Sequence, residues 1–80
     1  MKTLIKKLVN QGFEDVSIPF TILERKVNPY TERVIRIEVY EKDNIAVNVF
    51  MKDILEEEIG NAESLEECNQ LIHEYLEVNP

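Results

Sequence analysis

Hydrophobic and polar residues alternate along this chain with different periods, and each period predicts an element. Near the N-terminus the apolar residues recur at helical spacing: Leu4, Ile5, Leu8 and Val9. Gly12 follows where a glycine in the left-handed conformation commonly ends a helix, and Phe13 stands where such an ending places an apolar contact with Leu8. The pattern predicts a helix over residues 2–11.

From Val16 to Ile22 the period changes to two, which is the pattern of a half-buried strand. Pro19 lacks an N–H group, so this strand is expected at a sheet edge or after the proline. The sequence Asn28-Pro29-Tyr30-Thr31 predicts a type I turn and therefore a hairpin.

The register of that hairpin follows from keeping apolar residues opposite apolar residues. Pairing Val27 with Glu32 places Ile22 opposite Ile37. The apolar residues of the next two strands are all odd-numbered: Ile35, Ile37 and Val39, then Ile45, Val47, Val49 and Met51. Opposed residues share a face, so a loop with an odd number of residues is expected, and residues 42–44 fit it.

The last third predicts two helices. Asp53 with Glu56 is typical of a helix start, and Gly60 would close that short helix. Ser64 with Glu67 forms a capping box that opens the final helix. Its predicted buried stripe consists of Leu65, Cys68, Leu71, Ile72, Tyr75 and Leu76. The expected fold is α+β, with an N-terminal helix, a three-stranded antiparallel meander and two C-terminal helices packed on one sheet face.

The 80-residue length favours a single domain, 1–80, with one modest core. Cys68 is the only cysteine, so no intramolecular disulfide can form, and a reducing cytoplasmic location is expected. Charged residues interrupt the apolar positions near the N-terminus, so we expect no signal peptide, and no apolar run is long enough to cross a membrane.

Charge is unevenly distributed along the chain. Residues 1–50 have a net charge of +1 and residues 51–80 have a net charge of −8. An acidic patch repels phosphates, so direct nucleic-acid binding through the C-terminal third is disfavoured, whereas a basic protein surface is a suitable partner.

Several candidate chemistries are disfavoured by position. Cys68 lies on the predicted apolar stripe, and His73, the only histidine, is expected on another side of the helix. The consecutive side chains of residues 56–58 would point in different directions on a helix and could not converge on one metal ion. The two glycines, Gly12 and Gly60, form no phosphate-binding loop. We therefore expect a protein that is not an enzyme and has no cofactor or metal.

Two surfaces remain as candidates. The first, which we call the acidic surface, is expected on the two C-terminal helices and comprises Glu56, Glu57, Glu63, Glu66, Glu67, Glu74 and Glu77. Its ordinary meaning is a solvated face that keeps the protein soluble. The more specific interpretation is that the row of carboxylates mimics nucleic acid and blocks a basic nucleic-acid-binding protein, as an inhibitor of phage or mobile-element type would.

The second surface is the face of the sheet that carries the even-numbered residues of the second and third strands. The predicted hairpin register also places Leu23 of the first strand on this face. Its proposed contact residues are Val34, Arg36, Tyr40 and Phe50. If the helices cover only the odd-numbered face, this face stays open and could form a homodimer of a structural or accessory protein.

The predicted order of helix, three strands and helix resembles the double-stranded RNA-binding domain in topology. That family binds through basic residues around its second helix, and the corresponding region here is acidic, so its function is not carried over. The full predicted order is also similar to some small phage-encoded anti-CRISPR proteins, at the level of the fold alone.

Overall fold

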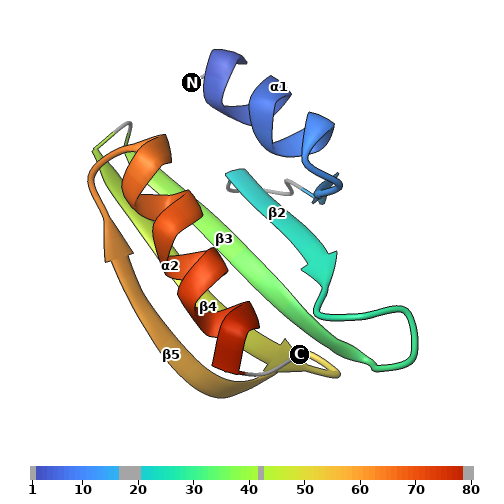
Figure 1. Cartoon of the computed structure of the whole chain (residues 1–80). Helices are drawn as coiled ribbons and strands as arrows, with labels where there is room; N and C mark the ends of the chain where they lie inside the picture. Colours follow the sequence, from blue (N-terminus) through green and yellow to red (C-terminus); the bar gives the residue numbers. More distant parts are fainter. Residues whose placement is uncertain (1, 17–20, 42, 79–80) are drawn as a thin grey trace.

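The computed structural model describes residues 2–16, 21–41 and 43–78. Within them the chain forms two helices and five strands (Figure 1). In chain order these are α1 (Lys2–Asn10), β1 (Glu14–Asp15), β2 (Thr21–Lys26), β3 (Arg33–Glu41), β4 (Asn44–Met51), β5 (Ile54–Ala62) and α2 (Leu65–Val78).

The five strands form one antiparallel sheet in the order β1-β2-β3-β4-β5. Both helices pack on the same face of this sheet, because residues of α1 and α2 join one apolar cluster with the odd-numbered residues of β3 and β4 (Figure 1). The fully buried side chains of the cluster include Leu8 of α1, Leu23 of β2, Ile37 of β3, Val47 of β4 and Cys68 of α2. No helix among the described residues covers the opposite face.

The predicted fold class is therefore wrong: the sheet has five strands rather than three, and one C-terminal helix follows it rather than two. The main error lies in residues 54–62, which form β5, and the short strand β1 was not predicted either. Lys52 and Asp53 adopt positive φ values of 52° and 65°, so the chain reverses immediately after β4 and pairs back along it. This backbone pairing overrides the helix preference of the glutamates. The resemblances to the double-stranded RNA-binding domain and to anti-CRISPR proteins depended on a three-stranded sheet and are therefore not supported.

The predicted register of the first hairpin is wrong by one residue. Lys26 lies opposite Val34, which puts Leu23 opposite Ile37 and moves Ile22 to the other face. The loop is longer than expected, because the Val27 N–H donates to the carbonyl of Arg33 at 3.0 Å. A slip of one residue exchanges the two faces of a strand, so Leu23 is in the core instead of on the open face.

Other local predictions are confirmed or corrected by small amounts. The turn at residues 28–31 is present, with the Thr31 N–H donating to the carbonyl of Asn28 at 3.4 Å. From Arg33 to Val39 the odd residues of β3 oppose odd residues of β4, as predicted, but Glu41 pairs with Asn44, so the loop is shorter than residues 42–44. The pairing shifts by one residue between Val39 and Glu41, so a shorter loop is compatible with the odd-to-odd pairing of the rest of the two strands. The expected strand at Pro19 lies outside the described residues.

The predicted caps are present at both helices, although α1 ends at Asn10, one residue before the predicted end. Gly12 has φ of 95°, and the Phe13 N–H donates to the Leu8 carbonyl at 3.1 Å, which is the Schellman ending of α1. At the start of α2 the Ser64 hydroxyl accepts a hydrogen bond from the Glu67 N–H at 3.2 Å. The Glu67 carboxylate accepts from the N–H of Glu63 at 3.1 Å, one residue earlier than in a standard capping box.

Candidate functional site

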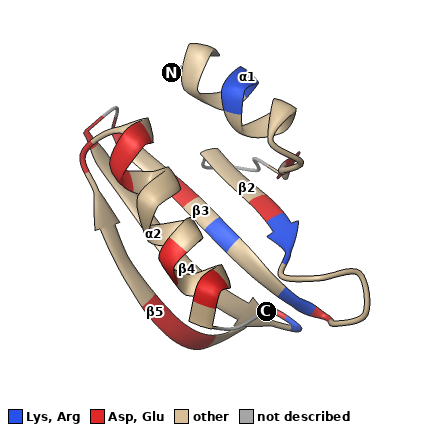
Figure 2. Ribbon diagram, in the orientation of Figure 1, with Lys and Arg blue, Asp and Glu red and all other residues tan. Residues whose placement is uncertain are grey.

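The acidic surface occupies one edge of the molecule. From Ile54 to Val78 the chain contains eight acidic residues and no lysine or arginine, and this stretch folds as β5, a short connection and α2. Since α2 packs against β5 and β4, the carboxylates of both elements gather on the same edge (Figure 2). The acidic surface was expected on two helices, but it lies on one helix, α2, and one edge strand, β5.

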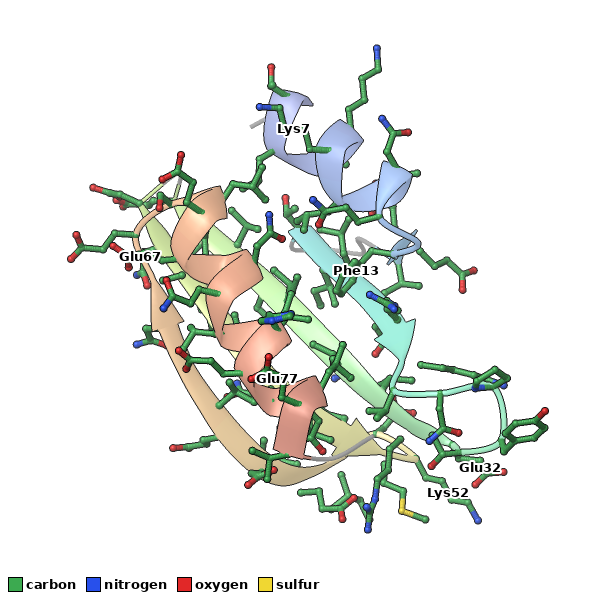
Figure 3. All side chains as sticks on the ribbon, viewed as in Figure 1. Lys7, Phe13, Glu32, Lys52, Glu67 and Glu77 are labelled. Carbon is green, nitrogen blue, oxygen red and sulfur yellow. The ribbon has the colours of Figure 1, made fainter. Side chains whose placement is uncertain are left out.

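The buried stripe of α2 turns its glutamates outward. Cys68 and Ile72 are buried, and the half-buried members of the stripe are Leu65, Leu71, Tyr75 and Leu76. Glu66, Glu67, Glu74 and Glu77 are all exposed. Glu67, Glu74 and Glu77 are spaced by seven and three residues, so they lie on one side of the helix. Glu67 and Glu77 extend from near its two ends (Figure 3).

Two of the seven predicted residues have oppositely charged or titratable partners. Glu56 Oε1 lies 2.8 Å from Arg33 Nη2, and Glu77 Oε1 lies 2.9 Å from His73 Nε2. Within the described ranges no lysine or arginine forms an ion pair with the other five predicted residues, Glu57, Glu63, Glu66, Glu67 and Glu74. The surface therefore keeps most of its negative charge.

A shallow groove runs between α2 and β5, with a volume of about 170 Å³. It is lined by Asn61, Glu67, Gln70, Leu71 and Glu74. The Gln70 side-chain amide donates to Glu74 Oε1 at 3.2 Å, which orients that carboxylate. Leu71 lies over the strand at Gly60, where a Cβ would be 3.6 Å from the Leu71 methyl groups, an ordinary van der Waals contact. Chemically, the groove offers carboxylates beside an apolar floor, which suits a long cationic side chain.

The open face of the sheet carries the second predicted set. Val34 lies opposite Phe50, and Tyr40 is 54% exposed with its hydroxyl donating to Glu38 Oε2 at 3.1 Å. This hydrogen bond raises the pKa of Tyr40. The four predicted residues lie on this face but do not form a single cluster, because Tyr40 lies at the opposite end of β3 from Val34.

Arg36 is held by its neighbours on this face. Its Nε and Nη2 atoms both lie 2.6 Å from Glu24 Oε2, and Nη2 lies 2.9 Å from Asp53 Oδ1. The guanidinium carbon is 4.0 Å from the centre of the Phe50 ring. Sequence reasoning missed Glu24 and Asp53 as partners; the correct hairpin register, which pairs Glu24 with Arg36, would have revealed the first.

The residues with catalytic or metal-binding chemistry are dispersed. Burial raises the pKa of the Cys68 thiol to about 11, so the thiol is neutral, and it lies in the core. His73 is exposed and contacts Glu77. Among the described residues no three histidine, cysteine, aspartate or glutamate side chains are grouped for a metal ion. No described helix has the length and hydrophobicity to span a membrane.

Comparisons with models of protein families, with curated proteins and with solved structures find no match for this chain.

Proposed function

We propose that this protein is a non-enzymatic interaction module whose acidic surface binds a basic surface on another protein. Where that basic surface serves to bind nucleic acid, occupation by the module makes it an inhibitor that mimics nucleic acid. The observation that carries the proposal is the row of exposed carboxylates on α2 and β5, of which only Glu56 has a lysine or arginine partner within the described residues. A field of one sign steers a partner of the opposite sign and repels phosphates.

The geometry of α2 supports this role. Glu67 and Glu74 are separated by two helical turns, about 10 Å along the axis. Their groove combines negative charge with the apolar surface of Leu71. Lysine and arginine side chains have a matching construction, since an apolar stem carries the charged head.

The test compares two triple variants of equal net charge. Glu66→Lys, Glu74→Lys and Glu77→Lys alter the acidic surface and leave the Glu67 cap in place. Glu14→Lys, Glu41→Lys and Asp43→Lys make the same charge change on exposed residues elsewhere. Each protein is immobilised and used to capture partners from cell extract at low ionic strength. The wild type and the second variant should retain a basic protein that the first variant does not.

The bound partner should dissociate as salt is raised and should also be displaced by duplex DNA or RNA. Equal loss of binding in both triple variants would mean that only net charge matters, and the proposal would then be wrong. Retention in all three proteins would contradict it as well.

The second candidate function is a homo-oligomer formed through the open sheet face. The observation that favours it is the exposed side chain of Tyr40 together with the cross-strand pair of Val34 and Phe50 on a face that no described helix covers. Tyr40→Ser should then convert a dimer to a monomer in light scattering, whereas the acidic-surface variant should not.

The proposed site of action is the cytoplasm. A single buried thiol and the lack of any intramolecular disulfide are compatible with a reducing compartment. Fluorescent tagging of the protein in its host checks this assignment.

A further inference from the structure

A second kind of surface adjoins the acidic one at the β4–β5 turn. Three apolar side chains are exposed there, which we call the hydrophobic tip: Met51 (39%), Ile54 (71%) and Leu55 (46%). Met51 lies opposite Ile54 on the face that the helices cover, and Leu55 lies opposite Phe50 on the open face, so the tip presents apolar side chains on both sides of the sheet end. The half-buried Phe50 and Val34 continue it across β4 and β3 on the open face. Exposed apolar residues gathered in this way mark contact sites.

The charges around the hydrophobic tip are nearly all matched. Lys52 pairs with Glu32 at 3.4 Å at the sheet end (Figure 3), Arg33 pairs with Glu56, and Arg36 pairs with Asp53. Every lysine and arginine that borders the tip in the described part of the chain is thus already neutralised. Beyond Glu56, the residues Glu57 and Glu58 continue β5 away from the tip, are exposed, and form no ion pair with a lysine or arginine of the described residues. The unpaired charge beside the tip is negative.

We propose that the hydrophobic tip is the anchor of the partner-binding surface and takes apolar side chains from a basic amphipathic segment of the partner protein. Glu58 lies opposite Asn48 on the same face as Leu55 and Phe50 and meets the cations of that segment, while Glu57 adds negative charge on the other face. This inference rests on the proposed function, and it specifies the partner: basic residues alone do not suffice, because buried apolar contacts supply most of the affinity while charges supply steering. A second copy of this chain is a poor occupant, since it would bring its own glutamates to the same contact.

The test uses two synthetic peptides of equal length and equal lysine content. One carries leucines at amphipathic helical spacing, and the other carries serine at the leucine positions. Binding is measured by fluorescence anisotropy over a range of salt concentrations. The leucine peptide should bind at least about tenfold more tightly than the serine peptide.

Three variants separate the contributions. Ile54→Ser with Leu55→Ser should reduce the leucine peptide to the affinity of the serine peptide and leave the salt dependence unchanged. Glu57→Gln with Glu58→Gln should weaken both peptides and flatten the salt dependence, with the ratio between the peptides retained. Val9→Ser removes a comparably exposed apolar side chain on α1 and should change neither. Circular dichroism and thermal unfolding show whether each variant is folded.

The outcomes distinguish this inference from the function it rests on. If both peptides bind equally, or if the Ile54 and Leu55 variant binds as the wild type does, the tip is not the anchor, while salt-dependent binding of the serine peptide still supports the acidic surface. If neither peptide binds even at low salt, the proposed function fails together with the inference. A tip variant that changes a dimer into a monomer without changing peptide binding identifies a second copy as the occupant and overturns the inference.

Discussion

At the scale of single residues, Arg36 shows how one side chain joins several strands on the open face. It contacts Glu24 of β2, the ring of Phe50 of β4, and Asp53 in the β4–β5 turn. The Arg36 side chain is only 18% exposed. Its charge is therefore committed within the molecule, and replacing it would loosen the sheet as well as change any contact that the face makes.

Cys68 illustrates the opposite case of a reactive group made inert by its position. It is fully buried on the side of α2 that packs against the sheet, within the apolar core. Desolvation disfavours the thiolate, and this burial raises the pKa of the thiol from 9.0 to about 11.

The shift has a consequence for stability at high pH. Between pH 9 and pH 11 the unfolded chain releases the thiol proton and the folded chain keeps it. The free energy of unfolding should be unaffected by this group below pH 9, and should fall by up to about 1.4 kcal/mol per pH unit above it. Urea unfolding of the wild type and of Cys68→Ala checks this, because the variant lacks the group and all other titrations cancel. A constant difference between the two proteins from pH 8 to pH 10.5 would contradict the expected shift.

At the scale of elements, β5 is an edge strand that carries its own protection against further pairing. Its register against β4 shifts between Val47 and Asn48 and again between Val49 and Phe50. The exposed residues Glu56, Glu57 and Glu58 lie along the same strand. Bulges and charges are the usual means by which edge strands avoid pairing with other chains. The acids of β5 therefore have a structural use in addition to their proposed role in binding.

The turn before β5 is strained by its residues. Lys52 at φ 52° is an L-residue without the local hydrogen bonding that makes asparagine tolerant of this conformation. Lys52→Asn should therefore raise the free energy of unfolding by about 0.5 kcal/mol, even though it removes the exposed pair with Glu32. Thermal or urea unfolding measures this change. Glu32→Gln breaks the same pair without altering the turn and serves as the control; a similar gain in that variant would show that backbone strain is not the cause.

At the scale of the whole molecule, the lysines and arginines are separated from the acidic surface along the order of the strands. The described lysines and arginines lie on α1, β2, β3 and the β4–β5 turn, while β5, the connection to α2 and α2 itself contain only acids (Figure 2). Glu66 and Glu67 suit the first turn of α2, where the helix dipole favours negative charge. The last turn contains no basic residue, so Glu77 opposes the dipole there.

Reversing a charge should therefore have opposite effects at the two ends of α2. Glu77→Lys should raise the free energy of unfolding by about 0.5 kcal/mol at low salt, because it removes repulsion and complements the dipole. Glu66→Lys, which makes the same change of net charge in the first turn, should lower it. Urea unfolding at low and high salt measures both, and the difference should shrink as salt is added. Equal gains from the two variants would indicate that total charge alone governs stability.

Features that depend on residues close together in the chain could be predicted from the sequence. The Schellman ending at Gly12, the Ser64 cap, the turn at residues 28–31 and the buried stripe of α2 were all predictable, because each depends on residues a few positions apart. The outward direction of the glutamates on α2 followed from that stripe.

Only the tertiary structure decided which backbone groups pair at long range. The glutamates of residues 56–58 favour a helix locally, yet β4 offers hydrogen-bonding partners along its length, and the segment becomes β5. The first hairpin likewise depends on a loop closed by Val27 and Arg33, which shifts the register by one residue and puts Leu23 in the core. These pairings placed Asp53 beside Arg36 and exposed the hydrophobic tip. Local patterns could not predict them, because the free energy of a strand resides in contacts with its neighbours rather than in its own residues.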